Sequence, residues 1–111
     1  MTEVIAVVRE AVGQDFVLMV DLRYSFPDAD TCLAAIRDWE KFNLFFIETP
    51  LPADDLPGYA RLANKQPIPI AAGEWLTTRF EFLDLIGSWQ SQSCAARYRA
   101  GRWPDGSLPG Q

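Results

Sequence analysis

Three carboxylates follow three short apolar runs at nearly regular intervals along the chain. Asp21, Glu48 and Glu74 each stand at or just beyond the end of such a run, 27 and 26 residues apart. Neighbouring parallel strands lie about 4.8 Å apart, so three of them can bring these side chains into one small volume. Anions that close together need a cation, and an all-oxygen ligand set suits Mg²⁺. The alternative is that these acids cap helices or lie in solvated loops.

The intervals match the length of a βα unit, and the surrounding pattern alternates between helix-like and strand-like segments. Apolar spacing predicts helices at 4–12, 33–39, 56–62 and 80–86, and continuous apolar runs predict buried strands at 16–20, 44–47 and 68–72. Alternation of this kind is typical of an α/β fold with a parallel sheet and right-handed crossovers. The carboxyl edge of such a sheet, where the three acids are expected, is also where ligands bind in α/β folds.

Residues with known capping preferences bound the predicted helices. Gly13 is expected to end the first helix, and the later helices are expected to begin at Asp28 or Asp30, at Asp54 or Asp55, and at Thr77 or Thr78.

The overall composition excludes several classes of function. The 111 residues include 10 Lys and Arg, 15 Asp and Glu and no His, which gives a net charge of −5. An acidic chain without a basic run is unsuited to nucleic acid or to an anionic membrane. Without His, Ser-His, Cys-His and His-metal chemistry are excluded, which leaves carboxylates as the reactive groups. We expect a cytoplasmic chain, because no run is long enough to span a membrane, no signal pattern begins the sequence, and Cys32 and Cys94 suggest no disulfide framework.

Longer segments around the acids resemble a known family. LMVD at 18–21, FFIETPL at 45–51, DDLPGYARLA at 54–63 and PIPIAAGEWLTTRFEFLDLI at 67–86 are similar to the enolase superfamily. The resemblance is to its mandelate racemase and muconate lactonizing enzyme branch, which includes acid-sugar dehydratases, and it covers residues 3–86. It implies that Asp21, Glu48 and Glu74 match three Mg²⁺ ligands at the ends of the third, fourth and fifth strands of a (β/α)8 barrel. Family members use this Mg²⁺ to stabilise the enediolate formed when a base removes the proton α to a carboxylate.

The resemblance also implies what this chain does not match. The family's bases are usually a Lys on the second strand and a His on the seventh, supported by an Asp on the sixth, and a separate domain caps the substrate. Lys41 and Lys65 fall instead in helical or loop segments. We therefore expect a partial barrel of about three βα units that keeps the metal ligands and is inactive alone on a carboxylate or sugar-acid substrate.

Two other functions stay open from the sequence. A companion chain can supply the missing strands and bases, which would make this chain half of a split enzyme. Alternatively, the acidic cluster belongs to an Mg²⁺-binding phosphoacceptor signalling module in which Asp21 accepts the phosphate. Because the outer strands of a partial sheet leave unpaired edges, we also expect self-association or pairing with a complementary fragment.

Further residues near the strand ends are weaker candidates for substrate contact. Arg23, Tyr24 and Arg79 are considered for binding an acid substrate, with a surface arginine as the ordinary alternative for Arg23. Trp39 and Trp75 are expected to pack in the core or at an interface rather than to contact substrate.

The composition changes at Ile86, so we divide the chain into a partial barrel domain at 1–86 and an irregular tail at 87–111. The first part holds seven basic and 14 acidic residues, whereas the tail holds three Arg and one Asp. With suitable codons for 95–107, a shift of one nucleotide reads QPDIGRAGGLTE, which resembles the sixth strand and turn of the family. We hypothesise a frameshift near Gly87, which the coding DNA tests directly; a disordered or lineage-specific extension is the alternative.

Overall fold

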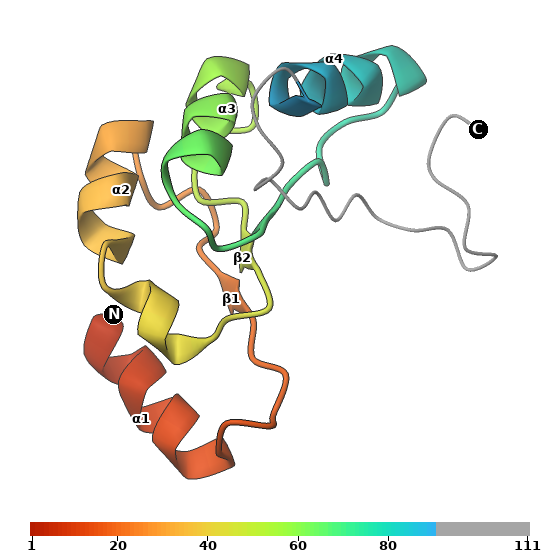
Figure 1. The fold of residues 1–111 in the computed structure, drawn as a ribbon. Coiled ribbons are helices and arrows are strands. Elements are labelled where there is room, and N and C mark those ends of the chain that lie inside the picture. The colour runs from red at the N-terminus through yellow and green to blue at the C-terminus, as the bar shows by residue number, and fades with distance from the viewer. Residues whose placement is uncertain (91–111) are drawn as a thin grey trace, which may run out of the picture.

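A computed structural model of the protein describes residues 1–90 (Figure 1). Its elements, in chain order, are α1 (Thr2–Val12), β1 (Val20–Asp21), α2 (Ala29–Ile36), the 3₁₀ helix η1 (Trp39–Phe42), β2 (Ile47–Glu48), α3 (Leu56–Lys65), β3 (Ile70–Ala71) and α4 (Arg79–Gln90). The predicted alternation of helices and strands is confirmed. None of the helices in this part of the chain is long and apolar enough to span a membrane.

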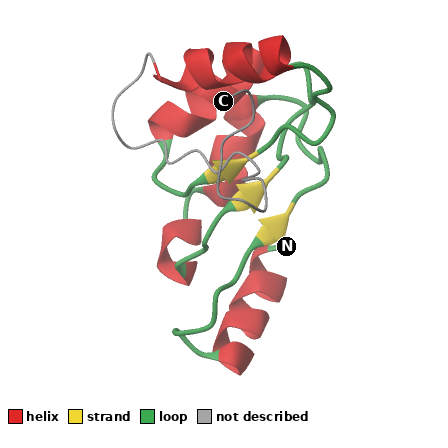
Figure 2. Cartoon of the chain, turned by 90° about the vertical axis from the view of Figure 1, so that its right-hand side faces the viewer, coloured by secondary structure: helices red, strands yellow, loops and turns green. Residues whose placement is uncertain are grey.

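The three strands form one parallel sheet in the order β1-β2-β3 (Figure 2). Val20 lies opposite Ile47, and Asp21 opposite Glu48. Ile47 in turn lies opposite Ile70. The sheet has the parallel order predicted for a partial (β/α)8 barrel, and its register places the ends of β1 and β2 side by side.

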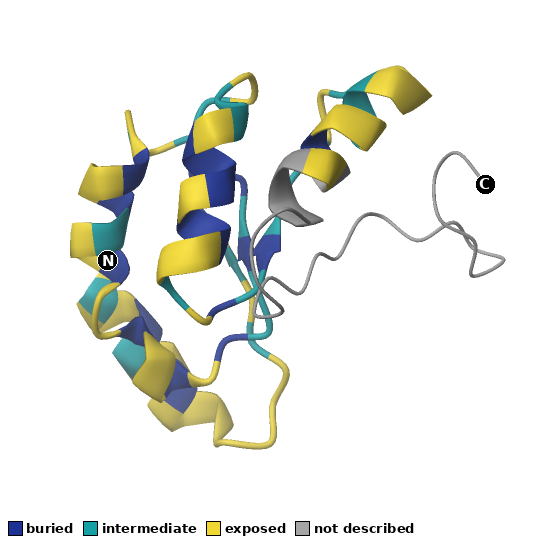
Figure 3. Ribbon diagram, turned by 45° about the horizontal axis from the view of Figure 1, so that its top comes forward, coloured by how far each residue is buried: buried dark blue, intermediate teal, exposed yellow. Residues whose placement is uncertain are grey.

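The core lies between the sheet and the helices that pack beside one another. α2 packs against α3, α3 against α4, and α1 against η1. Figure 3 shows that the buried residues follow the inner faces of α2 and α3 and the strands. Trp39, Tyr59 and Leu62 are among the most deeply buried side chains. The expectation that Trp39 packs in the core is confirmed, but it begins η1 rather than continuing the second helix, because α2 ends at Ile36.

The helix starts resolve the alternatives that the sequence left open. The Asp28 carboxylate accepts a hydrogen bond from the Thr31 amide at 2.7 Å, so Asp28 rather than Asp30 caps α2. Asp55, not Asp54, caps α3. At α4 the Thr78 hydroxyl accepts from the Glu81 amide at 3.2 Å and donates to the Glu81 carboxylate at 3.0 Å, so Thr78 rather than Thr77 caps α4.

Replacing Gly58 with Ala is expected to destabilise the chain by about 1–3 kcal/mol. The Gly58 amide donates to the Asp55 carboxylate at 3.0 Å, and an added Cβ would meet that carboxylate and lie 2.8 Å from Leu51 Cδ1. Urea unfolding of Gly58→Ala measures the loss. Gly87→Ala in α4 is the matched control, because a Cβ there meets nothing within 4 Å. The control should be as stable as the parent or more stable, since Ala favours helix, and an equal loss in both variants contradicts the account.

Two predicted apolar segments are less buried than expected. The run 16–20 was predicted to be a strand buried on both faces, but only Val20 joins β1, and Phe16, Val17 and Met19 are about half exposed. The reason is that, within residues 1–90, β1 is an edge strand with a neighbour on one side only. Similarly, of the four apolar residues predicted to line one face of α1, only Ile5 is buried, whereas Val4, Val8 and Val12 are exposed.

A charged residue is buried where the apolar pattern of α1 predicted none. Arg9 is 4% exposed, and its Nε donates to the Phe42 carbonyl at 2.8 Å. Its Nη1 donates to the Gly13 and Phe16 carbonyls at 2.9 and 2.7 Å, and its Nη2 to the Asn43 carbonyl at 3.0 Å. Arg9 thereby joins the end of α1, the connection to β1 and the end of η1.

The thiol of Cys32 is expected to resist alkylation in the folded chain. It is fully buried in α2, and this burial raises the pKa of the thiol to about 11. At pH 8 the reactive thiolate is therefore scarce as well as inaccessible. In a Cys94→Ser chain, a colorimetric thiol reagent should report almost no reaction at pH 8 until denaturant is added, and a rapid reaction without denaturant contradicts the placement of Cys32.

The predicted boundary at Ile86 does not coincide with a change of secondary structure. α4 continues through Gln90, so residues 87–90 are helical rather than irregular. The remainder of the predicted tail, with the segment on which the frameshift hypothesis depends, lies outside the described residues.

Candidate metal centre

Asp21 and Glu48 lie side by side at the carboxyl edge of the sheet. Each is the last residue of its strand, and the two are paired in register. Asp21 Oδ1 accepts hydrogen bonds from the Arg23 amide at 2.9 Å and from the Thr49 hydroxyl at 3.3 Å. These bonds hold the Asp21 side chain over the sheet edge, and within residues 1–90 no described hydrogen bond uses its second oxygen.

Glu48 lies close to two other carboxylates. It is half-buried and has no hydrogen-bond donor among the described residues. Burial raises the pKa of its carboxyl group, and the negative charges of Asp21 and Glu74 raise this pKa further. The three predicted acids therefore interact electrostatically, and within residues 1–90 no described hydrogen bond or ion pair offsets the negative charge of the Glu48 carboxylate.

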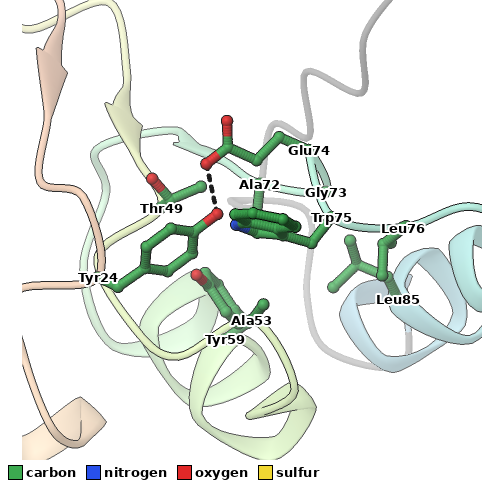
Figure 4. A pocket seen from close by; sticks show the side chains of 10 residues that line it. All are labelled: Tyr24, Thr49, Ala53, Tyr59, Ala72, Gly73, Glu74, Trp75, Leu76 and Leu85. Carbon is green, nitrogen blue, oxygen red and sulfur yellow. Dashed lines mark hydrogen bonds between the residues drawn. The ribbon is translucent and has the colours of Figure 1, made fainter.

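Glu74 is farther from its strand than the sequence pattern predicted. β3 ends at Ala71, which lies opposite Glu48 in the sheet, and Glu74 follows three residues later on an exposed turn. Gly73 makes this turn with φ at 113°, a conformation that a residue with a Cβ rarely adopts. The Glu74 carboxylate accepts a hydrogen bond from the Tyr24 hydroxyl (Figure 4).

Within residues 1–90, no three acidic, Cys or His side chains form a group arranged to hold a metal ion. Asp21 and Glu48 point from neighbouring strand ends, whereas Glu74 is turned toward Tyr24. Glu74 still lies close enough to Glu48 for its negative charge to raise the pKa of Glu48. The oxygen donors nevertheless suit Mg²⁺, which commonly binds one or two carboxylates directly and completes its octahedron with water or substrate oxygens.

The backbone at this edge adopts unusual conformations. Arg23, Tyr24 and Thr49 have φ values of 48°, 61° and 42°, in the left-handed region that residues other than glycine avoid. Their backbones are tied together, since the Tyr24 amide donates to the Thr49 carbonyl at 2.7 Å. Such conformations cost of order 1–3 kcal/mol each and cluster at functional sites. Thr49, which is 2% exposed, was missed in the sequence, although it directly follows Glu48.

Of the weaker candidates for substrate contact, Tyr24 is the one whose side chain bonds to a predicted metal ligand. Tyr24 lines a small pocket beside Glu74 together with Thr49, Tyr59 and Trp75 (Figure 4). Burial and the neighbouring Glu74 raise the pKa of the Tyr24 phenol to about 12, so it remains a hydrogen-bond donor at neutral pH. Trp75 is 67% exposed and therefore is not a core residue.

Among the described residues, no bond joins the side chain of Arg23, of Arg79 or of a lysine to the three acids. Arg23 is exposed beside Asp21, and the Arg79 guanidinium lies 5.0 Å from the centre of the Phe80 ring. Lys41 lies in η1, 5.3 Å from the centre of the Phe42 ring, and Lys65 ends α3. Both lysines precede a strand, which puts them toward the edge of the sheet opposite the carboxylates.

Comparison with known proteins identifies the fold family. A family profile described as enolase C-terminal domain-like matches residues 1–95. The chain belongs to this family. The resemblance read from its sequence segments is thus confirmed, and the comparisons favour the enolase relationship over the phosphoacceptor module.

Several relatives of this family member are enzymes that act on sugar acids. It is 47% identical over 79 residues to L-talarate/galactarate dehydratase of Salmonella typhimurium, covering 71% of this chain and 20% of the relative. The structure of L-talarate dehydratase from Polaromonas, complexed with Mg and L-glucarate, aligns with a TM-score of 0.72 and 42% identity over 76% of this chain and 23% of that one. A racemase from Streptomyces coelicolor with bound magnesium aligns with a TM-score of 0.72 and 34% identity, over 76% of this chain and 25% of the racemase. The chain therefore spans about a fifth to a quarter of the length of these relatives, and homologous structures contain Mg²⁺.

Proposed function

We propose that this chain provides the Mg²⁺-binding segment of an acid-sugar dehydratase or racemase, with Asp21, Glu48 and Glu74 as the metal ligands. The observation that supports this most is the position of Glu48, a half-buried carboxylate without a donor that is repelled by Asp21 on one side and Glu74 on the other. A divalent cation removes this repulsion and gives all three acids a common partner. Relatives whose structures contain Mg make this cation the natural choice.

The protein's own side chains prepare the site for an acid substrate. The Arg23 amide and the Thr49 hydroxyl orient Asp21, and the β1–β2 register holds Glu48 beside it. Bound at these carboxylates, Mg²⁺ supplies a fixed positive charge for the negative charge that develops on substrate carboxylate oxygens when the α-proton is removed. The exposed position of Glu74 leaves the substrate side of the site open to solvent.

The proton transfers need residues that this chain does not place at the site. The sequence contains no His, and Lys41 and Lys65 precede β2 and β3, toward the opposite edge of the sheet. We therefore expect the 111-residue chain to bind Mg²⁺ but to dehydrate no sugar acid alone. The names of the dehydratase relatives support small sugar acids, such as galactarate, as the proposed substrate class.

Isothermal titration calorimetry with magnesium chloride tests this function. The chain should bind about one Mg²⁺, and Glu40→Gln should bind equally well, because Glu40 lies in η1, before β2. Absence of Mg²⁺ binding in the parent chain, or loss of Mg²⁺ binding in the Glu40→Gln variant, would contradict the proposal. A parallel assay with galactarate should detect no 2-keto sugar acid, and turnover by the chain alone contradicts the expected inactivity.

A split enzyme is the second candidate, and the exposed outer edge of β1 favours it. Among the described strands β1 pairs only with β2, and Phe16, Val17 and Met19 leave apolar side chains exposed along the approach to β1. An unpaired edge with apolar neighbours is a template for another strand, supplied by a second copy or by a complementary fragment.

Val17→Lys is expected to shift the chain toward monomer in sedimentation velocity, because a charge beside the β1 edge opposes strand pairing. Val7→Lys is the matched control, since Val7 is also an exposed valine but lies on α1. A parent chain that is monomeric at all concentrations, or equal behaviour of both variants, argues against pairing of two copies through this edge.

A further inference from the structure

Of the three candidate ligands, Glu74 is the one whose position is least fixed by its own stretch of backbone. It lies three residues beyond β3, on an exposed turn that includes Gly73, and no backbone ladder holds it in register with Glu48. The described hydrogen bond of its carboxylate comes from the Tyr24 hydroxyl, 50 residues earlier in the chain. The position of Glu74 relative to the other acids therefore depends on Tyr24.

Tyr24 is itself held in place from both neighbouring segments. Its amide donates to the Thr49 carbonyl at 2.7 Å, directly after Glu48. The turn that carries it is closed by the Ser25 amide, which donates to the Leu22 carbonyl at 2.9 Å, and by the Phe26 amide, which donates to the Pro50 carbonyl at 3.1 Å. The phenol thus projects from a backbone that is fixed relative to β1 and β2.

Neighbouring side chains also hold the ring of Tyr24 in place. It is half-buried and lines the pocket with Thr49 and Tyr59, while the exposed indole of Trp75 lies on the Glu74 side of it (Figure 4). A supported ring keeps its hydroxyl in one place, and the hydroxyl donates to Glu74 Oε1. The second carboxylate oxygen, Oε2, then stays available to a cation, because this bond occupies one oxygen only.

We propose that Tyr24 is a positioning residue that holds the Glu74 carboxylate near Asp21 and Glu48 and thereby strengthens divalent-cation binding. This inference rests on the proposed function, since it assigns Tyr24 a role at the same site. Groups that hydrogen-bond to a metal ligand orient it, and their loss typically weakens metal affinity by about 10- to 100-fold. Tyr24 connects the end of β1 to the turn after β3 and so joins the outer two of the three strand ends.

Calorimetric titration of the full chain and its Tyr24→Phe variant with magnesium chloride tests the inference. Phenylalanine keeps the ring and removes only the donor to Glu74. We expect Mg²⁺ affinity to fall about 10-fold, whereas the melting temperature without metal should change little, because the lost bond joins the ring to an exposed carboxylate. Tyr59→Phe is the contrasting variant: the Tyr59 hydroxyl is buried and donates to the Leu51 carbonyl at 2.7 Å, so this variant should melt earlier and keep its Mg²⁺ affinity.

A double variant shows whether Tyr24 acts through Glu74. If it does, Tyr24→Phe combined with Glu74→Gln should bind Mg²⁺ no more weakly than Glu74→Gln alone. Additive losses overturn the inference, as does parental affinity in Tyr24→Phe. Absence of Mg²⁺ binding in the parent chain is a different result, because it overturns the proposed function and with it any positioning role, whereas binding that is insensitive to Tyr24 overturns this inference alone.

Discussion

Replacing Glu48 with Gln is expected to abolish stabilisation of the chain by Mg²⁺ and to raise its melting temperature when no metal is present. Both effects have one cause, the repulsion of the Glu48 carboxylate by Asp21 and Glu74, which also raises its pKa. Gln removes that negative charge and keeps the shape of the side chain. Without metal, the repulsion among the three side chains therefore decreases. With metal, the cation loses a charged ligand. Thermal melting with and without magnesium chloride measures both effects.

The size of the Mg²⁺ effect follows from mass action. At a metal concentration of 100 times the dissociation constant, the free energy of unfolding of the parent chain should rise by about 2.7 kcal/mol. Glu48→Gln should show almost none of this gain, whereas Glu40→Gln, which changes an exposed acid in η1, should show all of it. Identical responses of the parent chain and Glu48→Gln would argue against an assembled site.

Replacing Arg9 with Met is expected to destabilise the chain by about 3 kcal/mol or more and to release α1. Met fills similar space but donates no hydrogen bond, so the buried Phe42 carbonyl loses its described side-chain partner and the Gly13, Phe16 and Asn43 carbonyls lose theirs. Helix release should appear in circular dichroism as lost helical signal before the main unfolding transition in urea.

Arg37→Met is the matched control for Arg9. Arg37 is exposed at the end of α2, and no hydrogen bond or ion pair of its side chain is described within residues 1–90. Its replacement should change the free energy of unfolding by less than about 0.5 kcal/mol. If the two variants lose equal stability, the network of Arg9 does not anchor α1.

Features that depend on nearby residues could be predicted from the sequence. Asp28 and Thr78 cap helices by bonding to amides three residues later, and short-range signals of this kind are visible in a single sequence. The regular spacing of Asp21 and Glu48 likewise predicted their adjacency, because two parallel strands of a βα repeat end at the same edge.

Features that depend on distant segments could not be predicted. Arg9 bonds to residues 33 and 34 positions later, and Tyr24 bonds to Glu74 across 50 positions. Apolar spacing carries no signal for such pairs, so it predicted an apolar face for α1 and left Tyr24 as a weak substrate candidate. The exposure of Phe16 and Val17 was missed for a related reason, since burial of a strand depends on neighbours as well as on its own residues.

Anomalous diffraction from crystals grown with Mn²⁺ tests whether Asp21, Glu48 and Glu74 together hold one divalent cation. Mn²⁺ prefers the same octahedral oxygen ligands as Mg²⁺ and can be located by its anomalous scattering. We expect one strong peak at the carboxyl edge of the sheet, with oxygen atoms of all three side chains bound to the ion. A peak elsewhere on residues 1–90, or a sheet edge without a peak at saturating Mn²⁺, would contradict it.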